Sequence, residues 1–319
     1  MIKNKNCIET ILNSSKLIKK LNVNGGNFNS EAYLYKLRSN YYVVRKIGNQ
    51  YNLSAKRLAV LEKDVNNYYK ILKKHLPNNL PNIFLTKIDK KQKVILLATE
   101  YFSKKIIDIK NISQKFKYFK VISKLIIKLV SSRSNLYLNN LICSIDPSPD
   151  NFFLDSKNKL IYNDFTPPLF RKDGKWSEFR RLDEINAKKS DKEKRYFIGL
   201  NLLLIFINKA RIYLSFSDYL KFVRWLFNKI NRLHLLQQNS LVVFFKIYKE
   251  ILSDKVLDFH KLKQYATLRD ILRFTLTFRK DLNSFQIKKI YERSKKIDGI
   301  DILIKKLYGK NKNSYNRSR

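Results

Sequence analysis

The residues with the clearest capacity for chemistry lie between Ser144 and Pro168 (SIDPSPDNFFLDSKNKLIYNDFTPP). Two carboxylates and one amide, those of Asp146, Asp164 and Asn151, stand at the edges of two short apolar runs. Carboxylate and amide oxygens are ligands that Mg²⁺ takes in proteins, often together with oxygens of a substrate phosphate. The pattern alone predicts a metal site, and the alternative is that Asp and Asn only form turns here.

The two apolar runs, FFL and LIY, predict a β-hairpin that would bring these side chains together. If the turn centres on Lys157 and Asn158, antiparallel counting places Asn151 opposite Asp164. Asp146 approaches the same end of the hairpin along a loop that two prolines make rigid.

This segment resembles the catalytic loop of kinases, in which an Asp is followed by an Asn in the pattern D-x-x-x-x-N and then by a second metal-binding Asp. Asp146 and Asn151 have that spacing, and Asp164-Phe165 stands where the second Asp is expected. With Pro149 inside the loop, the chain is most similar to the aminoglycoside phosphotransferase and choline kinase group, whose loop runs D-x-x-P-x-N. The resemblance implies that Asp146 is the catalytic base, which orients an acceptor hydroxyl, and that Asn151 and Asp164 hold Mg²⁺.

The strand and helix patterns around the segment predict an α+β protein. β-branched or aromatic runs and apolar residues at helical spacing indicate three strands within 17–47, a helix at 54–76 with Ser54 as its N-cap, two strands at 83–87 and 93–99, a helix at 113–132, and mostly helix after about residue 194. The resemblance covers about residues 20–210 and implies a bilobal protein-kinase-like fold. Its parts are a small β-rich N-terminal nucleotide-binding lobe (1–102), a larger, mostly helical C-terminal catalytic and substrate lobe (103–304), and a basic tail (305–319).

The run VVRK, which ends at Lys46, resembles the kinase strand V-A-I-K that carries the ATP-binding lysine. The resemblance implies that Lys46 contacts the α- and β-phosphates, while its neighbour Arg45 points to the opposite face of the strand. Glu62 is the expected partner of Lys46, because it lies on the apolar, inward arc of the helix at 54–76 and an unpaired carboxylate is costly there. The alternative is a solvated Glu62 at the edge of that arc.

Further nucleotide contacts are expected by position. Gly25 and Gly26 can cover phosphates with their backbone N–H groups, although Asn-Gly-Gly-Asn is also simply a good turn. The connector between the lobes, with Glu100 and Phe102, is expected to contact adenine through its backbone.

Three departures from the kinase pattern leave a catalytically inactive scaffold open as an alternative. No G-x-G-x-x-G is present, Ser144-Ile145 precedes Asp146 where His or Arg is usual, and Thr166-Pro167-Pro168 follows the Asp-Phe pair in place of Gly. The prolines restrict motion of the chain after Asp164, which argues against a regulated protein kinase.

The amino-acid composition limits which binding partners and which cellular compartment we expect for the protein. The formal net charge is +40, from 66 Lys and Arg against 26 Asp and Glu, and it favours contact with nucleic acid, an anionic membrane or phosphorylated molecules. Biased residue usage is the competing explanation. Two cysteines and three scattered histidines indicate neither a disulfide framework nor a metal-ligand spacing, and we expect a cytoplasmic protein without a transmembrane segment.

The sequence therefore predicts an ATP- and Mg²⁺-dependent phosphotransferase acting on a hydroxyl of a small molecule or lipid-linked saccharide. The alternative is an inactive kinase-like scaffold that binds a polyanion. No motif within 170–300 identifies the acceptor.

Overall fold

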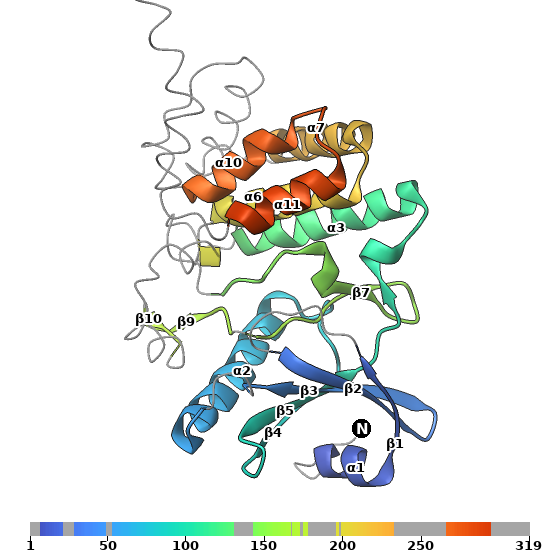
Figure 1. Cartoon of the computed structure of the whole chain (residues 1–319), viewed down its shortest axis with the longest axis vertical. Coiled ribbons are helices and arrows are strands. Elements are labelled where there is room, and N and C mark those ends of the chain that lie inside the picture. The colour runs from blue at the N-terminus through green and yellow to red at the C-terminus, as the bar shows by residue number, and fades with distance from the viewer. Residues whose placement is uncertain are drawn as a thin grey trace, which may run out of the picture. The chain divides into compact units, whose positions relative to one another are not determined.

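The computed structural model describes residues 7–21, 29–48, 53–130, 143–166, 168–172, 175–177, 196–197, 199–232 and 266–294. Its N-terminal part is built on an antiparallel five-stranded sheet and its C-terminal part is largely helical (Figure 1), which confirms the predicted α+β class. By contacts the chain divides into two compact units. The first comprises Met1–Asp108 and Asp150–Lys189, and the second comprises Ile109–Pro149 and Ser190–Arg319.

The sheet of the first unit has the strand order β1-β2-β3-β5-β4. Its strands are β1 (Lys16–Leu21), β2 (Asn29–Leu37), β3 (Asn40–Ile47), β4 (Phe84–Asp89) and β5 (Val94–Glu100). β5 is an almost continuous run of buried aliphatic residues, and β3 buries Tyr42, Val43, Val44 and Ile47, as expected of central strands covered on both faces. In the described part of the sheet β1 is an edge strand, and its Leu17 and Ile18 are 51% and 41% exposed.

Helix α2 (Ala55–His75) covers one face of the sheet. Ser54 caps it, because its Oγ accepts a hydrogen bond from the Arg57 N–H at 3.4 Å. Leu58, Leu61 and Val65 are buried at helical spacing, so the predicted helix and its N-cap are confirmed.

A short helix that the sequence did not predict, α1 (Cys7–Ser14), covers the opposite face. Its Ile8 and Ile11 pack in one cluster with Tyr42 and Val44 of β3. The central strands are therefore buried from both sides by helices that belong to the same unit.

A second small sheet with the order β6-β7-β8 completes the first unit. It consists of β6 (Lys104–Lys105), β7 (Phe152–Leu154) and β8 (Leu160–Tyr162). The 3₁₀ turn η2 (Ile106–Asp108) contacts β7, and the turn η4 (Pro149–Asn151) directly precedes β7 in the chain. β9 (Arg171–Lys172) and β10 (Lys175–Trp176) form a separate two-stranded sheet.

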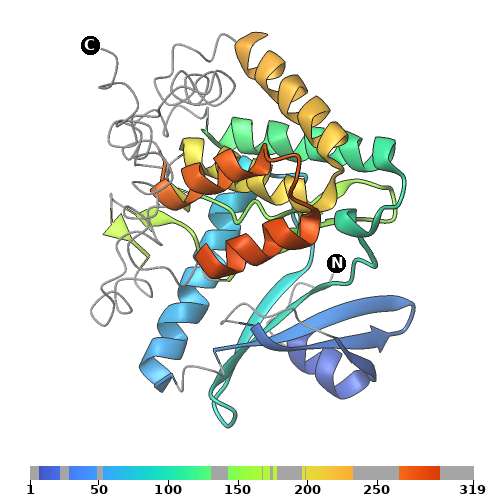
Figure 2. The ribbon, with the colours of Figure 1, turned by 45° about the horizontal axis from the view of Figure 1, so that its top comes forward.

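The second unit is built around helix α6, which contacts the other helices described there (Figure 2). Helix α6 comprises Gly199–Tyr213. The helices around it are α3 (Ile112–Val130), α7 (Phe216–Arg232), α10 (Leu268–Thr277) and α11 (Ser284–Ser294). Phe119 of α3, Phe206 of α6 and Phe222 of α7 meet edge to face with centroids 5.7–5.9 Å apart. Gly199 permits the close approach of α6 to α3, because a Cβ there would lie 2.8 Å from Val130 Cγ1.

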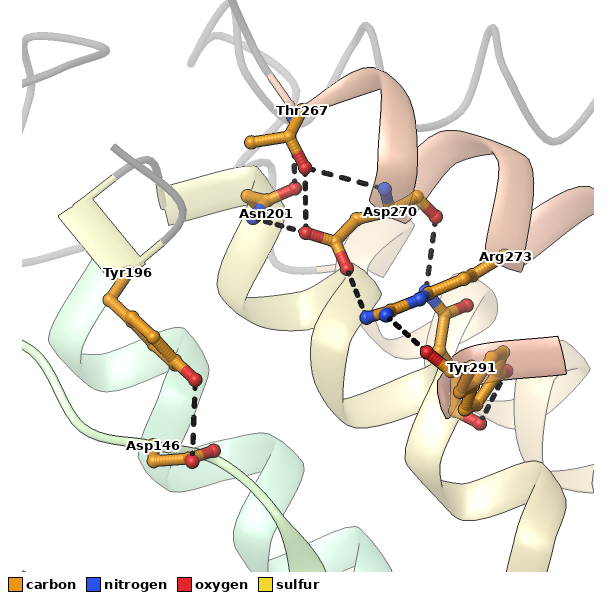
Figure 3. Close-up of polar contacts among 8 residues, drawn as sticks. Asp146, Tyr196, Asn201, Thr267, Asp270, Arg273 and Tyr291 are labelled. Atoms are coloured by element: carbon orange, nitrogen blue, oxygen red, sulfur yellow. Dashed lines mark hydrogen bonds and ion pairs between the residues drawn. The ribbon is translucent and has the colours of Figure 1, made fainter. Parts of the chain in front are cut away.

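A buried polar network ties α6, α10 and α11 together (Figure 3). Asp270 is fully buried, and its Oδ2 accepts hydrogen bonds from Asn201 Nδ2 at 3.0 Å and Thr267 Oγ1 at 2.7 Å. Its Oδ1 lies 3.5 Å from Nη1 of Arg273, which is 2% exposed and donates from Nη2 to the carbonyl of Tyr291 at 3.0 Å. Each buried charge in this network is thus paired and hydrogen-bonded.

Candidate functional site

The β7–β8 hairpin brings Asn151 and Asp164 together in the first unit. Asn151 Nδ2 donates a hydrogen bond to Asp164 Oδ2 at 3.3 Å, and Asp164 Oδ1 accepts one from the Thr166 N–H at 3.3 Å. Both side chains are half-buried. The predicted pair of oxygen-bearing side chains therefore exists at the open end of the hairpin.

The predicted strand register is wrong by one residue. Phe152 pairs with Tyr162, and the Asn163 N–H donates to the Asn151 carbonyl at 3.0 Å, so Asn151 lies opposite Asn163. The cause is the turn, in which Asn158 adopts a left-handed conformation (φ 58°) and an odd number of residues separates the strands. The side chains of Asn151 and Asp164 still meet, because Asp164 is the next residue along the chain.

Contacts within the first unit hold the hairpin in place. Asn79 brackets β8, since its carbonyl accepts from the Tyr162 N–H at 2.8 Å and its Nδ2 donates to the Leu160 carbonyl at 2.9 Å. Phe165 is buried, with its ring edge-on to Phe84 of β4 at 4.9 Å. The residue after Asp164 thus anchors the site to the large sheet, and sequence reasoning missed Asn79 because it is distant in the chain.

The donor set at this end of the hairpin suits a hard divalent cation. One carboxylate and one amide are the groups that the resemblance assigned to Mg²⁺, and Asp150 and Asn163 flank them with buried Oδ1 atoms that accept no hydrogen bond from the described residues. No group of three or more His, Cys, Asp or Glu side chains able to hold a metal occurs among the described residues. A metal held here would need further ligands, and phosphate oxygens are the usual ones for Mg²⁺.

The sheet register decides which basic side chain of β3 shares a face with α2. Directly paired residues point to the same side of a sheet. Arg45 pairs with Leu97, which pairs with Thr86, and Thr86 donates a hydrogen bond from Oγ1 to Glu62 Oε1 of α2 at 3.1 Å. Arg45 and Glu62 therefore lie on the α2 face of the sheet.

Lys46 lies on the opposite, α1 face. It pairs with Leu96, which pairs with Lys87, and Lys87 forms an ion pair with Glu9 of α1. The expectation that Lys46 faces α2 and that Arg45 points away is therefore wrong, since the two residues occupy each other's expected faces.

The electrostatics of Arg45 connect it to the hairpin. Its Nη1 donates to the buried Thr99 Oγ1 at 3.1 Å. Burial lowers the pKa of the Arg45 guanidinium to about 10, and the negative charge of Asp164 acts in the opposite direction. The charge of Asp164 therefore acts on the pKa of Arg45, whereas the sequence motif pointed to the neighbouring Lys46.

The predicted ion pair between Lys46 and Glu62 is replaced by other contacts. Lys46 Nζ lies 3.2 Å from Glu31 Oε2, and it lies 5.2 Å from the centroid of the Tyr33 ring. Glu31 also accepts hydrogen bonds from Lys20 at 2.8 Å and from the Tyr33 hydroxyl at 2.9 Å. These bonds, led by that of Lys20 and with Lys46 adding to them, lower the pKa of Glu31 to about 2. Lys46 therefore has a cross-strand partner on the α1 face.

The connector after β5 is joined to the hairpin. Glu100 Oε2 accepts a hydrogen bond from the Asn82 N–H at 2.9 Å, and the Phe102 ring lies 6.3 Å from that of Phe153 in β7. Lys104 and Lys105 of β6 pair with β7. The expected adenine contacts of Glu100 and Phe102 stay predictions, whereas Gly25 and Gly26 fall outside the described residues, as do Pro167 and the tail at 305–319.

Asp146 belongs to the second unit, where two groups orient its carboxylate. Oδ1 accepts a hydrogen bond from the Ser148 N–H at 3.1 Å, and Oδ2 accepts one from the Tyr196 hydroxyl at 3.4 Å (Figure 3). The carbonyl of Tyr196 in turn accepts a hydrogen bond from Ser144 Oγ, so Tyr196 is fixed to the same short segment at two points. No pattern in the sequence pointed to Tyr196, because it is separated from Asp146 by about fifty residues and carries no motif of its own.

Cys143, close to this carboxylate, is no candidate nucleophile. It is 2% exposed, and burial raises the pKa of its thiol well above the usual range. Cys143 is therefore a small buried side chain of the core.

Comparison with models of known protein families finds no match for this chain, and a search of curated proteins finds none either. Within the described residues, no helix combines the length and the apolar character needed to cross a bilayer.

Proposed function

We propose that the protein is an ATP- and Mg²⁺-dependent phosphotransferase with a protein-kinase-like fold, acting on a hydroxyl of a small molecule or lipid-linked saccharide. The observation that carries the proposal is the contact between Asn151 and Asp164 at the open end of the hairpin, within the same unit as Arg45 on the α2 face of the sheet. Asp146 precedes Asn151 at the spacing that the kinase-like catalytic loop requires.

In this proposal each side chain has a separate task. Asn151 and Asp164 hold Mg²⁺, which when bound neutralises charge on the phosphate oxygens. Arg45 contacts the nucleotide phosphates, because a guanidinium donates charge-assisted hydrogen bonds to phosphate oxygens. Asp146, oriented by Ser148 and Tyr196, accepts the proton of the acceptor hydroxyl.

A catalytically inactive scaffold is the second candidate. It is favoured by one observation, namely that the expected ATP-binding residue Lys46 is paired with Glu31 on the other face of the sheet. Such a scaffold would use its positive charge, rather than the residues above, to bind a polyanion.

ATP with Mg²⁺ is expected to raise the melting temperature of the wild-type protein by roughly 5 °C at a ligand concentration about a hundred times Kd. Asp164→Asn is expected to lose this rise, since the amide keeps the shape of the side chain but removes the charge that binds the metal. Thermal unfolding with ATP alone, Mg²⁺ alone and both together measures it.

Asp155→Asn is the matched control, because Asp155 is the other carboxylate of the hairpin and its Oδ1 only accepts backbone hydrogen bonds within the turn. It should keep the full Mg²⁺-dependent rise. A wild-type protein that shows no rise at any concentration would favour the inactive scaffold.

Arg45 and Lys46 offer a test of the reassigned phosphate contact. Arg45→Met is expected to weaken the binding of Mg²⁺–ATP by about 10- to 100-fold, which corresponds to the loss of a hydrogen bond between charged groups. Lys46→Met should change the affinity by less than about threefold, because Lys46 lies on the α1 face and is paired there with Glu31. Isothermal titration of both variants measures the difference, and the opposite ranking would return the role to Lys46.

A further inference from the structure

Helix α3 carries a stripe of lysines opposite its buried side. Lys117, Lys124 and Lys128 are exposed and Lys120 is half-buried, and at 100° per residue all four fall within an arc of about 80°. The helix contains no acidic residue. The first and last of these lysines are eleven positions apart, so the stripe is about 16 Å long, and no acidic residue of the helix offsets its charge.

Helix α7 extends this surface. It packs against α3, and Lys120 Nζ of α3 lies 5.1 Å from the centroid of the half-buried Trp225 ring of α7. Lys221 and Arg224 are exposed on the same side of α7 as Trp225. Asp218 is the single acidic residue of the helix and lies 3.6 Å from Lys221.

These side chains form one surface, which we call the α3–α7 basic face. It consists of Lys117, Lys120, Lys124, Lys128, Lys221 and Arg224. Cation–π contacts of Lys120 with Trp225 and with Phe116, at 4.7 Å from the latter's centroid, hold the middle of the face in a fixed arrangement.

The chemistry of this face favours a diffuse anionic surface over an individual phosphate group. Five of its six cations are lysines, which act as point charges, whereas bidentate readout of phosphates and bases relies mainly on arginine. The charges follow two packed helices, and a group of four to eight lysines and arginines on such helices is the feature that binds anionic lipid. Trp225 within the face suits the interface between headgroups and water.

We propose that the α3–α7 basic face docks the protein onto the surface of an anionic lipid bilayer. The inference is independent of phosphoryl transfer, because none of its residues belongs to the candidate site. It also gives part of the net charge of +40 a specific location and role.

The test is co-flotation of the full-length protein with vesicles of phosphatidylcholine containing about one-third phosphatidylserine, at low salt. We expect the wild-type protein to bind these vesicles but not vesicles of phosphatidylcholine alone. Replacing Lys117, Lys124 and Lys128 together by Gln should reduce the partition coefficient by about 100-fold, since each lysine near an anionic surface contributes about a fivefold factor.

Helix α2 supplies a matched control with the same loss of three charges. Lys56, Lys63 and Lys70 are exposed and recur at a seven-residue spacing along one side of α2. Their replacement by Gln should reduce partitioning by less than about fivefold. Melting temperatures of both triple variants report whether the fold is intact.

Three results would overturn the proposal. One is the absence of wild-type binding to the anionic vesicles at low salt. Another is an equal loss of binding in the α2 and α3 variants, which would mean that total charge rather than this face attracts the protein. The third is tighter binding of a nucleic-acid duplex than of the vesicles, with the same dependence on the α3 lysines.

Discussion

Asp146→Asn is expected to lower the rate of phosphoryl transfer by about 10²- to 10⁴-fold and to leave the binding of Mg²⁺–ATP unchanged. The amide can still accept the hydrogen bond of the Ser148 N–H, so the loop should keep its shape. It cannot take a proton from the acceptor hydroxyl, so the rate of transfer should fall while the affinity for Mg²⁺–ATP stays the same. Release of phosphate from ATP with water as the acceptor, followed in a single turnover, measures the rate before the natural acceptor is identified.

Asp155→Asn serves as the control for this change as well, because it makes the same chemical replacement at the closed end of the hairpin. Its turnover should stay within about threefold of the wild-type value. That change is much smaller than the loss expected when a general base is removed. Normal turnover of Asp146→Asn would show that another group removes the proton. A loss of nucleotide binding in the same variant would instead mean that Asp146 acts on the metal or the phosphates.

Asp270→Ala is expected to reduce the free energy of unfolding by about 3–5 kcal/mol, the largest effect on stability that the structure suggests. Removing this carboxylate leaves the guanidinium of Arg273 buried without its counter-charge and takes the acceptor from Asn201 and Thr267. It also removes the acceptor that fixes the hydroxyl of Thr267, the side chain that caps α10 by accepting from the Asp270 N–H. Urea unfolding of the full chain measures the loss.

An exposed Arg–Asp pair in the same unit provides the comparison. Arg279 and Asp281 form a bidentate ion pair with both side chains more than half exposed, and Asp281→Ala should lower the free energy of unfolding far less than Asp270→Ala does. Adding Arg273→Met to Asp270→Ala should restore part of the lost stability, because the double variant no longer buries an unpaired charge. Equal effects of the two Asp replacements would contradict the argument from burial.

Local patterns were sufficient to predict much of the fold. The β-branched and aromatic run of β3, the 3.6-residue spacing within α2 and the cap at Ser54 each depend on neighbouring residues, and the structure confirms the strands and the helix. The meeting of Asn151 with Asp164 was predictable for the same reason, since a short hairpin connects them.

The errors arose where the answer depends on distant parts of the chain. The period of two in a strand requires Arg45 and Lys46 to point to opposite faces, but which face meets α2 depends on the pairing of β3 with β2 and β5. Helices cover both faces of the sheet. The unpredicted helix α1 covers the face that carries Lys46, and its Glu9 pairs with another lysine of that face, Lys87. Tyr196 approaches Asp146 only through the packing of the second unit.

Within the residues that the structure describes, β1 lies at an edge of the large sheet, and this edge links the unusual charge of the protein to its behaviour at high concentration. Leu17 and Ile18 are exposed on a strand that also carries Lys16, Lys19 and Lys20, and apolar edge strands are sites where separate copies can pair. Lysines at such an edge repel a second copy that approaches with the same charges. This repulsion acts through solvent and is screened by salt, so we expect concentrated salt to favour edge-to-edge assembly.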